Sequence, residues 1–209
     1  MRNPSRRHSS ASPMTRAARF FVAPFLAVGL LSGCLATVNP NATDPPTAAP
    51  LPEATEASPI FASNEEALAA ALEAYAAYTK ASDGFVTNEI DRNDLSVFET
   101  LVSPRYLPDI LDGLESFSKS GRRGMGKSEF DTASIVSYAD VTDGKAEVDL
   151  YLCSDYSAIR VFDANGVDVT PPDRPDRVPL QVGFVSKVSD PTKLLIDRED
   201  SWRGQDFCH

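Results

Sequence analysis

The predicted folded domain, residues 63–209, begins with apolar residues at helical spacing. Ser63 and Glu66 form a capping box, which predicts that a helix begins at residue 63. Asp83-Gly84 predicts the end of this helix, because glycine commonly follows a last turn. The apolar positions between these signals are Leu68, Ala71, Leu72, Tyr75 and Tyr78.

Two further helices are predicted before residue 121. The first spans residues 94–101, with Leu95, Phe98 and Leu101 on its inner face. Ser103-Pro104 and Pro108 then interrupt the pattern, since proline fits only the first turn of a helix. The next apolar stripe ends at Gly121, and it consists of Leu107, Ile110, Leu111, Leu114 and Phe117.

After residue 126 the apolar spacing changes from helical to every second residue. Asp143-Gly144 predicts a hairpin turn that follows an apolar run around residues 135–138. The alternation after this turn predicts a half-buried strand, with Ala146, Val148, Leu150 and Leu152 facing inward. Further strands are predicted around residues 159–162, 178–184 and 194–196. Helices followed by an antiparallel meander predict one α+β domain over residues 63–209.

Residues 1–33 have the pattern of a bacterial lipoprotein signal peptide. The apolar run Phe20–Leu31 follows several arginines, and its length of about 18 Å is too short for a bilayer core of roughly 30 Å. Leu31, Ser32 and Gly33 precede Cys34 as in a lipobox, where the cysteine is acylated and becomes the first mature residue. We therefore expect an anchor in the lipid bilayer at Cys34, on the extracytoplasmic face of the cell membrane. The alternative is a secreted protein with an incidental cysteine.

Residues 34–62 differ in composition from the predicted domain. This segment is rich in Pro, Ala and Thr, and its first aromatic residue is Phe61. Such a composition buries too little apolar surface to repay the entropy of ordering. We expect a disordered tether that holds the domain away from the membrane.

The net charge of the chain argues against some classes of partner, and its few histidines argue against a metal site. The first 33 residues hold five of the 20 Lys and Arg and none of the 30 Asp and Glu, so residues 34–209 carry a formal charge of −15. This charge argues against binding to nucleic acid. The only histidines are His8 and His209, so no metal site is predicted. The glycine-rich segment 121–126 matches neither a phosphate loop nor a dinucleotide motif, and we predict no cofactor there, only a mobile loop after a helix cap.

The remaining two cysteines form an even pair. With Cys34 used for lipid, Cys153 and Cys208 are available in an exported chain where disulfides persist. A bridge between them would close a loop of about 55 residues and stabilise the fold by about 4 kcal/mol. A disulfide is the preferred interpretation, and two free thiols are the alternative.

The element order and several local motifs resemble NTF2-like (cystatin-like cone) domains. More narrowly, they are similar to NTF2-like lipoproteins of high-GC Gram-positive bacteria. The resemblance implies three N-terminal helices packed into the concave face of a long, bent antiparallel sheet. It covers residues 63–209 and rests on Tyr75-x-x-Tyr78, Ser103-Pro104, Gly121-Arg122-x-Gly124, Cys153-Ser154-Asp155-Tyr156-Ser157, and Trp202-x-Gly204 with Cys208.

The resemblance leaves several functions open, because this fold hosts enzymes and binding modules alike. Enzymes similar to it place Asp, Tyr or a His–Asp pair inside the cone, and the predicted domain has no internal histidine. Tyr75, Tyr78, Tyr106 and Asp91 are the candidate pocket residues, although aromatic residues at helical spacing are also typical of a core.

The preferred hypothesis is a non-catalytic module that binds a small apolar ligand or an envelope protein. The alternatives are an isomerase or dehydratase that uses an Asp–Tyr pair, and a structural lipoprotein. A cavity lined by an inward carboxylate with a raised pKa would favour the enzyme.

Overall fold

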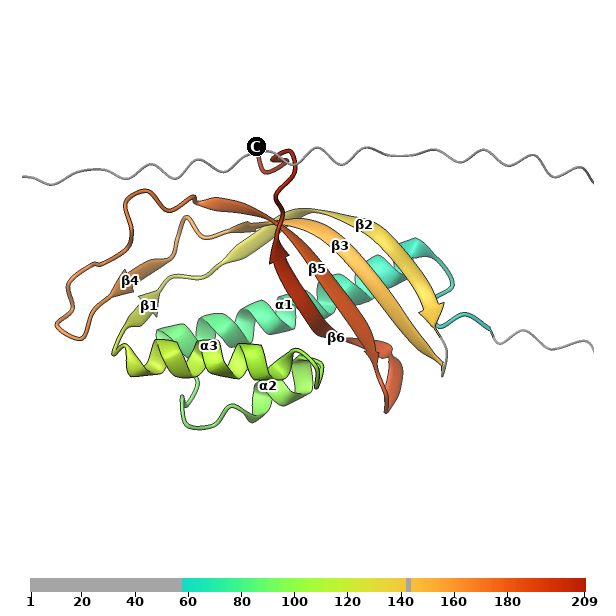
Figure 1. Ribbon diagram of the computed structural model, residues 1–209, viewed down its shortest axis with the longest axis horizontal. Coiled ribbons are helices and arrows are strands. Elements are labelled where there is room, and N and C mark those ends of the chain that lie inside the picture. The colour runs from blue at the N-terminus through green and yellow to red at the C-terminus, as the bar shows by residue number, and fades with distance from the viewer. Residues whose placement is uncertain (1–57, 142–143) are drawn as a thin grey trace, which may run out of the picture. The chain divides into compact units, whose positions relative to one another are not determined.

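The computed structural model describes residues 58–141 and 144–209 (Figure 1). The lipobox residues Leu31, Ser32, Gly33 and Cys34 and most of the predicted tether lie outside the described residues. The helices are α1 (Asn64–Thr87), α2 (Ser96–Leu101) and α3 (Leu107–Lys119). The strands are β1 (Arg123–Met125), β2 (Glu129–Val141), β3 (Lys145–Asp155), β4 (Arg160–Phe162), β5 (Arg177–Lys187) and β6 (Asp190–Ser201).

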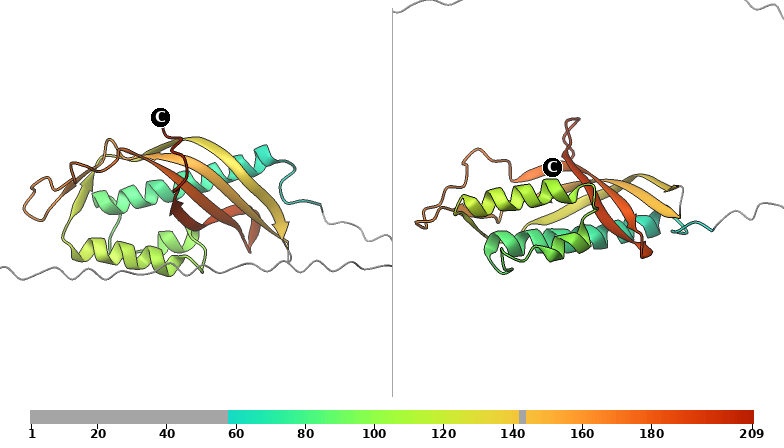
Figure 2. Two further views of the ribbon diagram at one scale, coloured as in Figure 1. Left: turned by 45° about the horizontal axis from the view of Figure 1, so that its top comes forward. Right: turned by 60° about the horizontal axis from the view of Figure 1, so that its bottom comes forward.

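The helices lie on one side of a twisted antiparallel sheet, in an α+β arrangement as predicted. The main sheet has the strand order β2-β3-β5-β6, and β1 pairs with β4 in a small second sheet. The helix α1 lies against one face of the main sheet, α2 and α3 lie on the same side of the sheet, and the C-terminal segment crosses the other face (Figures 1 and 2). Val141 pairs with Lys145, which places a chain reversal where Asp143-Gly144 predicts one. None of the described helices is long and apolar enough to cross a bilayer.

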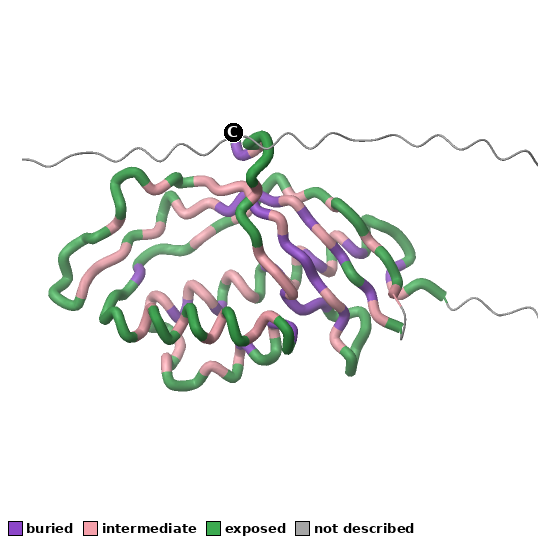
Figure 3. The backbone as a smooth tube through the Cα atoms, in the orientation of Figure 1, coloured by how far each residue is buried: buried purple, intermediate pink, exposed green. Residues whose placement is uncertain are grey.

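The core lies between α1 and the inner face of the sheet. Small residues of α1, including Ala67 and Ala71, let the helix lie close to the strands. Each Val, Leu, Ile or Phe that is fully buried stabilises the fold by roughly 1.5–3 kcal/mol. The buried segments converge on the centre of the sheet (Figure 3). Their apolar residues on β3, β5 and β6 are Val148, Leu150, Leu152, Leu180, Val182, Phe184 and Ile196.

The first helix begins as predicted but ends later. The capping box is present, since the Glu66 backbone N–H donates to the Ser63 hydroxyl (3.3 Å) and the Glu66 carboxylate accepts from the Ala62 N–H (2.7 Å). The helix continues through Gly84 to Thr87, and Asn88 ends it in the left-handed conformation. Gly84 is buried, and a Cβ there would lie 2.9 Å from Ile90. The glycine therefore permits close packing, and the prediction that it ends the helix is wrong.

The glycine-rich segment is part of the fold, and the prediction of a mobile loop is wrong. Its residues 123–125 form β1, which pairs with β4. Gly126 has a φ of +93°, and a Cβ there would lie 2.0 Å from the Ala158 carbonyl oxygen. Glycine at this position allows two backbones to approach each other more closely than any side chain would permit.

The domain also begins earlier than residue 63. Phe61 is only 2% exposed, and its ring packs edge-on against Tyr138 with centroids 5.6 Å apart. The Phe61 N–H donates to the Tyr138 hydroxyl at 3.0 Å. The predicted tether boundary at residue 62 is therefore wrong by a few residues, because Phe61 belongs to the core.

Cys153 and Cys208 form the predicted disulfide. Their Cα atoms lie 5.5 Å apart, and the bridge spans 55 residues of sequence. Cys153 faces outward from β3, beside Tyr151, whose ring packs against Trp202 (4.7 Å) and Phe207 (5.8 Å). The bridge and these aromatic rings fasten the C-terminal segment to the outer face of the sheet.

Candidate functional site

The inner face of the sheet changes from apolar to polar toward one end. Every second residue of β3 faces α1, and these positions are apolar from Ala146 to Leu152. Ser154, which is 2% exposed, and then Tyr156 continue the same alternation. Ser154 lies opposite Phe130 on β2, so a polar group enters the inner face beside an aromatic ring.

A β-bulge on β6 directs a carboxylate toward the same end. Phe184 pairs with Ile196 and Gly183 pairs with Arg198, so Asp197 is an extra residue in the strand. Val182 faces the core and pairs with Glu199, which therefore shares the inner face. In a strand of this sequence without the bulge, Glu199 would lie one register position away, on the outer face.

The helix α1 supplies the opposite wall of the site. Its contributing residues recur every three or four positions and so share one face of the helix. Together with residues of the sheet and the following loop they enclose a cavity of about 290 Å³. Its lining consists of Tyr75, Tyr78, Thr79, Ser82, Asp83, Val86, Ser128, Ser154, Tyr156, Ile159 and Glu199.

Burial determines the protonation of the groups in this cavity. Removal from water raises the pKa of the Glu199 carboxyl, the negative charge of Asp200 adds to this effect, and hydrogen bonding to Tyr75 opposes it. Burial also raises the pKa of the Tyr75 and Tyr78 hydroxyls, and the charge of Glu199 raises each further. The tyrosines therefore stay neutral, and Glu199 loses its proton less readily than a carboxyl in water does.

The four residues predicted for a pocket have different positions. Tyr75 and Tyr78 line the cavity, with ring centroids 6.3 Å apart. Tyr106 is half-buried beside the Glu199 backbone and packs against the core, outside the cavity lining. Asp91 is exposed in the turn after α1, where it accepts hydrogen bonds from the Asn93 N–H and amide group, both at 2.9 Å. Asp91 is not a pocket residue, because its carboxylate closes a local turn.

Glu199, Ser154 and Tyr156 were not predicted as site residues. Ser154 and Tyr156 could have been found by extending the alternation of residues 146–152 two steps further. Glu199 gives no such signal, because its inward direction depends on the bulge at Asp197.

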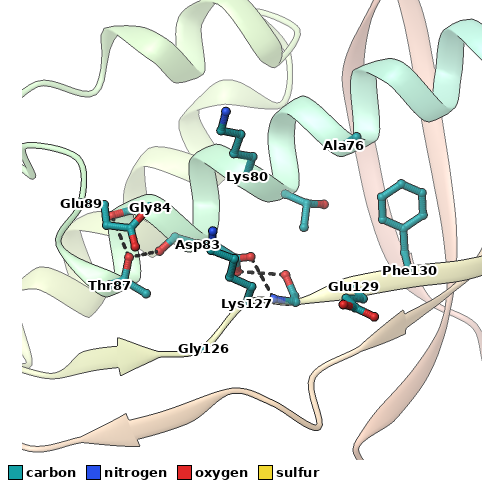
Figure 4. A pocket seen from close by; sticks show the side chains of 12 residues that line it. Ala76, Lys80, Asp83, Gly84, Thr87, Glu89, Gly126, Lys127, Glu129 and Phe130 are labelled. Atoms are coloured by element: carbon teal, nitrogen blue, oxygen red, sulfur yellow. Dashed lines mark hydrogen bonds between the residues drawn. The ribbon is translucent and has the colours of Figure 1, made fainter.

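A second, larger hollow of about 500 Å³ shares part of its lining with the first, including Asp83, and is drawn in Figure 4. Asp83 accepts hydrogen bonds from the Ser128 N–H and hydroxyl, both at 2.9 Å, and both residues line both cavities. Apart from Asp83, the charged side chains of the larger hollow, which include Lys80, Lys127 and Glu129, are exposed. The smaller cavity is the stronger candidate, because its polar side chains are buried or half-buried. Among the residues that the structure describes, no three His, Cys, Asp or Glu side chains are grouped to hold a metal.

No family model and no curated protein sequence matches this chain. Among solved structures, the intermembrane space region of the chloroplast protein ARC6 aligns with 64% of this chain and 95% of its own length, at 12% identity and a TM-score of 0.44. A periplasmic fragment of TraM aligns with 68% of this chain and 98% of its own length, at 15% identity and a TM-score of 0.41. Because both TM-scores are below 0.5, these similarities identify neither a shared fold family nor a function.

Proposed function

We propose that the domain is a binding module for a small organic molecule, which occupies the cavity around Glu199. The observation that carries this proposal is the convergence of polar side chains from α1, β3 and β6 on one hollow of an otherwise apolar face. A cavity and a desolvated carboxyl both cost folding free energy. Such costs are typical of sites that are retained for binding or chemistry.

The proposed setting is the extracytoplasmic face of a membrane, with the chain anchored through lipid on Cys34. The lipobox supports this proposal, and the Cys153–Cys208 disulfide fits an oxidising compartment. Cys34→Ala should release the protein into the medium or leave it as unprocessed precursor. Unchanged membrane retention of the variant would contradict the anchor.

We also propose that the domain is NTF2-like. Three helices on one face of a twisted antiparallel sheet support this assignment, and so does a cavity between the helices and the sheet. Ligand sites commonly occupy hollows of this size and chemistry, where an apolar wall carries a few convergent polar groups.

The binding proposal is tested by filling the cavity. Ser82 lines it from α1, so Ser82→Phe should occupy the space that a ligand needs. The matched control is Ser116→Phe on the exposed side of α3. A screen of small molecules by thermal shift should give hits with the wild type and the Ser116 variant and none with the Ser82 variant. Hits that persist in Ser82→Phe would place binding elsewhere.

A second candidate function is acid–base catalysis by Glu199 with Tyr75. The raised pKa of Glu199 favours it, because a carboxyl that titrates nearer neutral pH is a better general acid or base. Glu199 would then take the role expected of Asp91 in an Asp–Tyr pair. Recovery of each bound molecule unchanged after incubation supports a binding module. Turnover that Glu199→Gln abolishes supports the enzyme.

A further inference from the structure

The charges around the Glu199 cavity are all of one sign. Two carboxylates line it, those of Glu199 and Asp83, and its lining contains no Lys, Arg or His. Hydroxyl groups make up most of the remaining polar lining, and they can accept as well as donate hydrogen bonds. The cavity is therefore unfavourable for an anion.

The basic side chains near this end of the sheet are directed to other groups. Arg198 adjoins Glu199 in sequence but lies on the outer face, where it contacts the Asp149 carboxylate at 2.6 Å. Arg174 donates from Nη2 to the carbonyl oxygens of Tyr156 (2.8 Å) and Ile159 (3.1 Å). Neither residue lines the cavity, so no basic side chain of the lining balances the Glu199 carboxylate.

Aromatic rings complete the cavity walls. Tyr75 and Tyr78 contribute from α1, and Tyr156 contributes from the loop that follows β3. Tyrosine rings attract cations through their negative faces, and sites that combine several such rings recognise alkylated ammonium groups. A desolvated carboxylate beside them would supply the counter-charge.

We propose that the ligand of this cavity is a small organic cation, an amine or a quaternary ammonium compound, with Glu199 as its counter-ion and the three tyrosines around its alkyl groups. This inference rests on the proposed binding function and names the chemical class of the ligand. The charge of −15 on residues 34–209 also favours the approach of cations over anions.

The ionisation of Glu199 should make cation binding depend on pH. The titratable groups that face or adjoin Glu199 are Tyr75, Tyr78, Tyr106, Tyr156, Asp83 and Asp200, with Arg174 nearby. The tyrosines stay neutral because burial raises each pKa. A quaternary ammonium ion keeps its charge at every pH, so its binding should strengthen as Glu199 ionises and should level off above the pKa of Glu199.

The test compares two probes of one shape. Choline carries a positive nitrogen, and 3,3-dimethylbutan-1-ol has carbon in the same place and no charge. Calorimetric titration of the mature protein in detergent should show choline binding at least about tenfold more tightly, a difference of about 1.4 kcal/mol. Equal binding of the two probes would overturn the cation proposal and leave small-molecule binding intact.

Two variants make the result specific to Glu199. Glu199→Gln removes the charge and keeps the shape, so the preference for choline and its pH dependence should both disappear. Asp91→Asn makes the same change of charge at an exposed carboxylate outside the cavity, and the preference should remain. Choline binding that survives Glu199→Gln would overturn the proposal, provided that circular dichroism shows the variant folded.

The remaining outcomes separate this inference from the proposed function. If choline does not bind and the screen finds a neutral or anionic ligand that Ser82→Phe excludes, the cation proposal is wrong. The proposal of a binding site in this cavity is then still supported. If nothing binds in the cavity, both proposals fail. Displacement of choline by phosphatidylcholine vesicles would identify a lipid headgroup as the source of the cation, whereas unchanged choline binding would identify a free small cation.

Discussion

The two ends of the sheet's inner face are built by the same strands and differ in chemistry. At one end, Ala146, Val148 and Phe184 pack against α1 in a buried apolar core. At the other, Ser154, Tyr156 and Glu199 face a cavity. Strand alternation decides which residues face inward at both ends. The residue types at the end of each strand, and one bulge, decide whether that face becomes core or site.

Contacts on the outer face stabilise the polar end of the sheet, where the inner face lines a cavity. Cys153 adjoins Ser154 in β3 and points the opposite way, into the disulfide with Cys208. Tyr151 and Trp202 cover the same region of the outer face. The apolar end has no need of such a covalent link, because buried side chains hold it. The polar end therefore depends on contacts made behind the site.

The largest expected effect follows from removal of the disulfide. Cys153→Ser with Cys208→Ser should lower the free energy of unfolding by about 4 kcal/mol, because the unfolded chain gains the freedom of a 55-residue loop. Urea unfolding measures the loss. Hydrogen exchange should rise first around residues 151–155, and a uniform rise over both ends would contradict the stated difference between them.

Truncation at the apolar end should have the next largest effect. Leu150 is 0% exposed, so Leu150→Ala should cost about 3 kcal/mol through lost burial and the space left behind. Ser154→Ala, further along the same face, should cost about 1 kcal/mol. Urea midpoints of the two variants test the comparison. Equal losses would show that the polar end is packed as tightly as the core.

Gly126→Ala tests the backbone contact beside the polar end. A Cβ at this position would lie 2.0 Å from the Ala158 carbonyl oxygen, and its φ of +93° is unfavourable for alanine. We expect a loss of about 2 kcal/mol in thermal unfolding. Gly144→Ala is a suitable control, because Gly144 also has a positive φ but a Cβ added there would meet no other atom within 4 Å. Equal losses in both variants would assign the whole effect to φ.

The pH dependence of stability should identify the desolvated carboxyl of Glu199, which is half-buried. Because the pKa of Glu199 is raised on folding from an ordinary value of 4.5, the folded protein binds its proton more strongly than the unfolded chain does. The contribution of Glu199 to stability is therefore lost as pH rises from about 4.5 through the raised pKa. Glu199→Gln should gain stability relative to the wild type over this window. Thermal unfolding from about pH 4 to pH 8 measures the difference, and a constant difference would show that Glu199 is solvated.

The smallest effect is expected at a surface ion pair that neither end requires. Lys193 contacts Glu73 at 2.8 Å, and both side chains are more than half exposed. Water and salt screen such a pair. Lys193→Ala should leave the unfolding temperature almost unchanged, and a marked decrease would assign this contact a structural role.

Sequence patterns predicted the three helices, the strands other than β1 and the inner face of β3, because apolar spacing reports burial directly, whereas the strand at residues 123–125 was predicted as a loop. They placed two boundaries wrongly, at Gly84 and at residue 62. At Gly84 a contact with Ile90, six residues further on, outweighed the local signal, and at residue 62 a long-range contact between Phe61 and Tyr138 did so. Tyr75 and Tyr78 could be predicted as cavity residues from their helical spacing. Glu199 could not, since an extra residue in β6 reverses the alternation after Ile196.

The bulge that directs Glu199 inward also affects how the sheet ends. Its extra residue, Asp197, accepts hydrogen bonds from the Ser103 hydroxyl (2.5 Å) and from the Arg105 guanidinium. The Ser103 N–H donates to the Ile196 carbonyl oxygen at 2.8 Å, so the segment between α2 and α3 covers part of the open side of β6. Irregular and covered edges are a common protection against strand addition by a second chain. One inserted residue thus both prepares the cavity and discourages aggregation along this border.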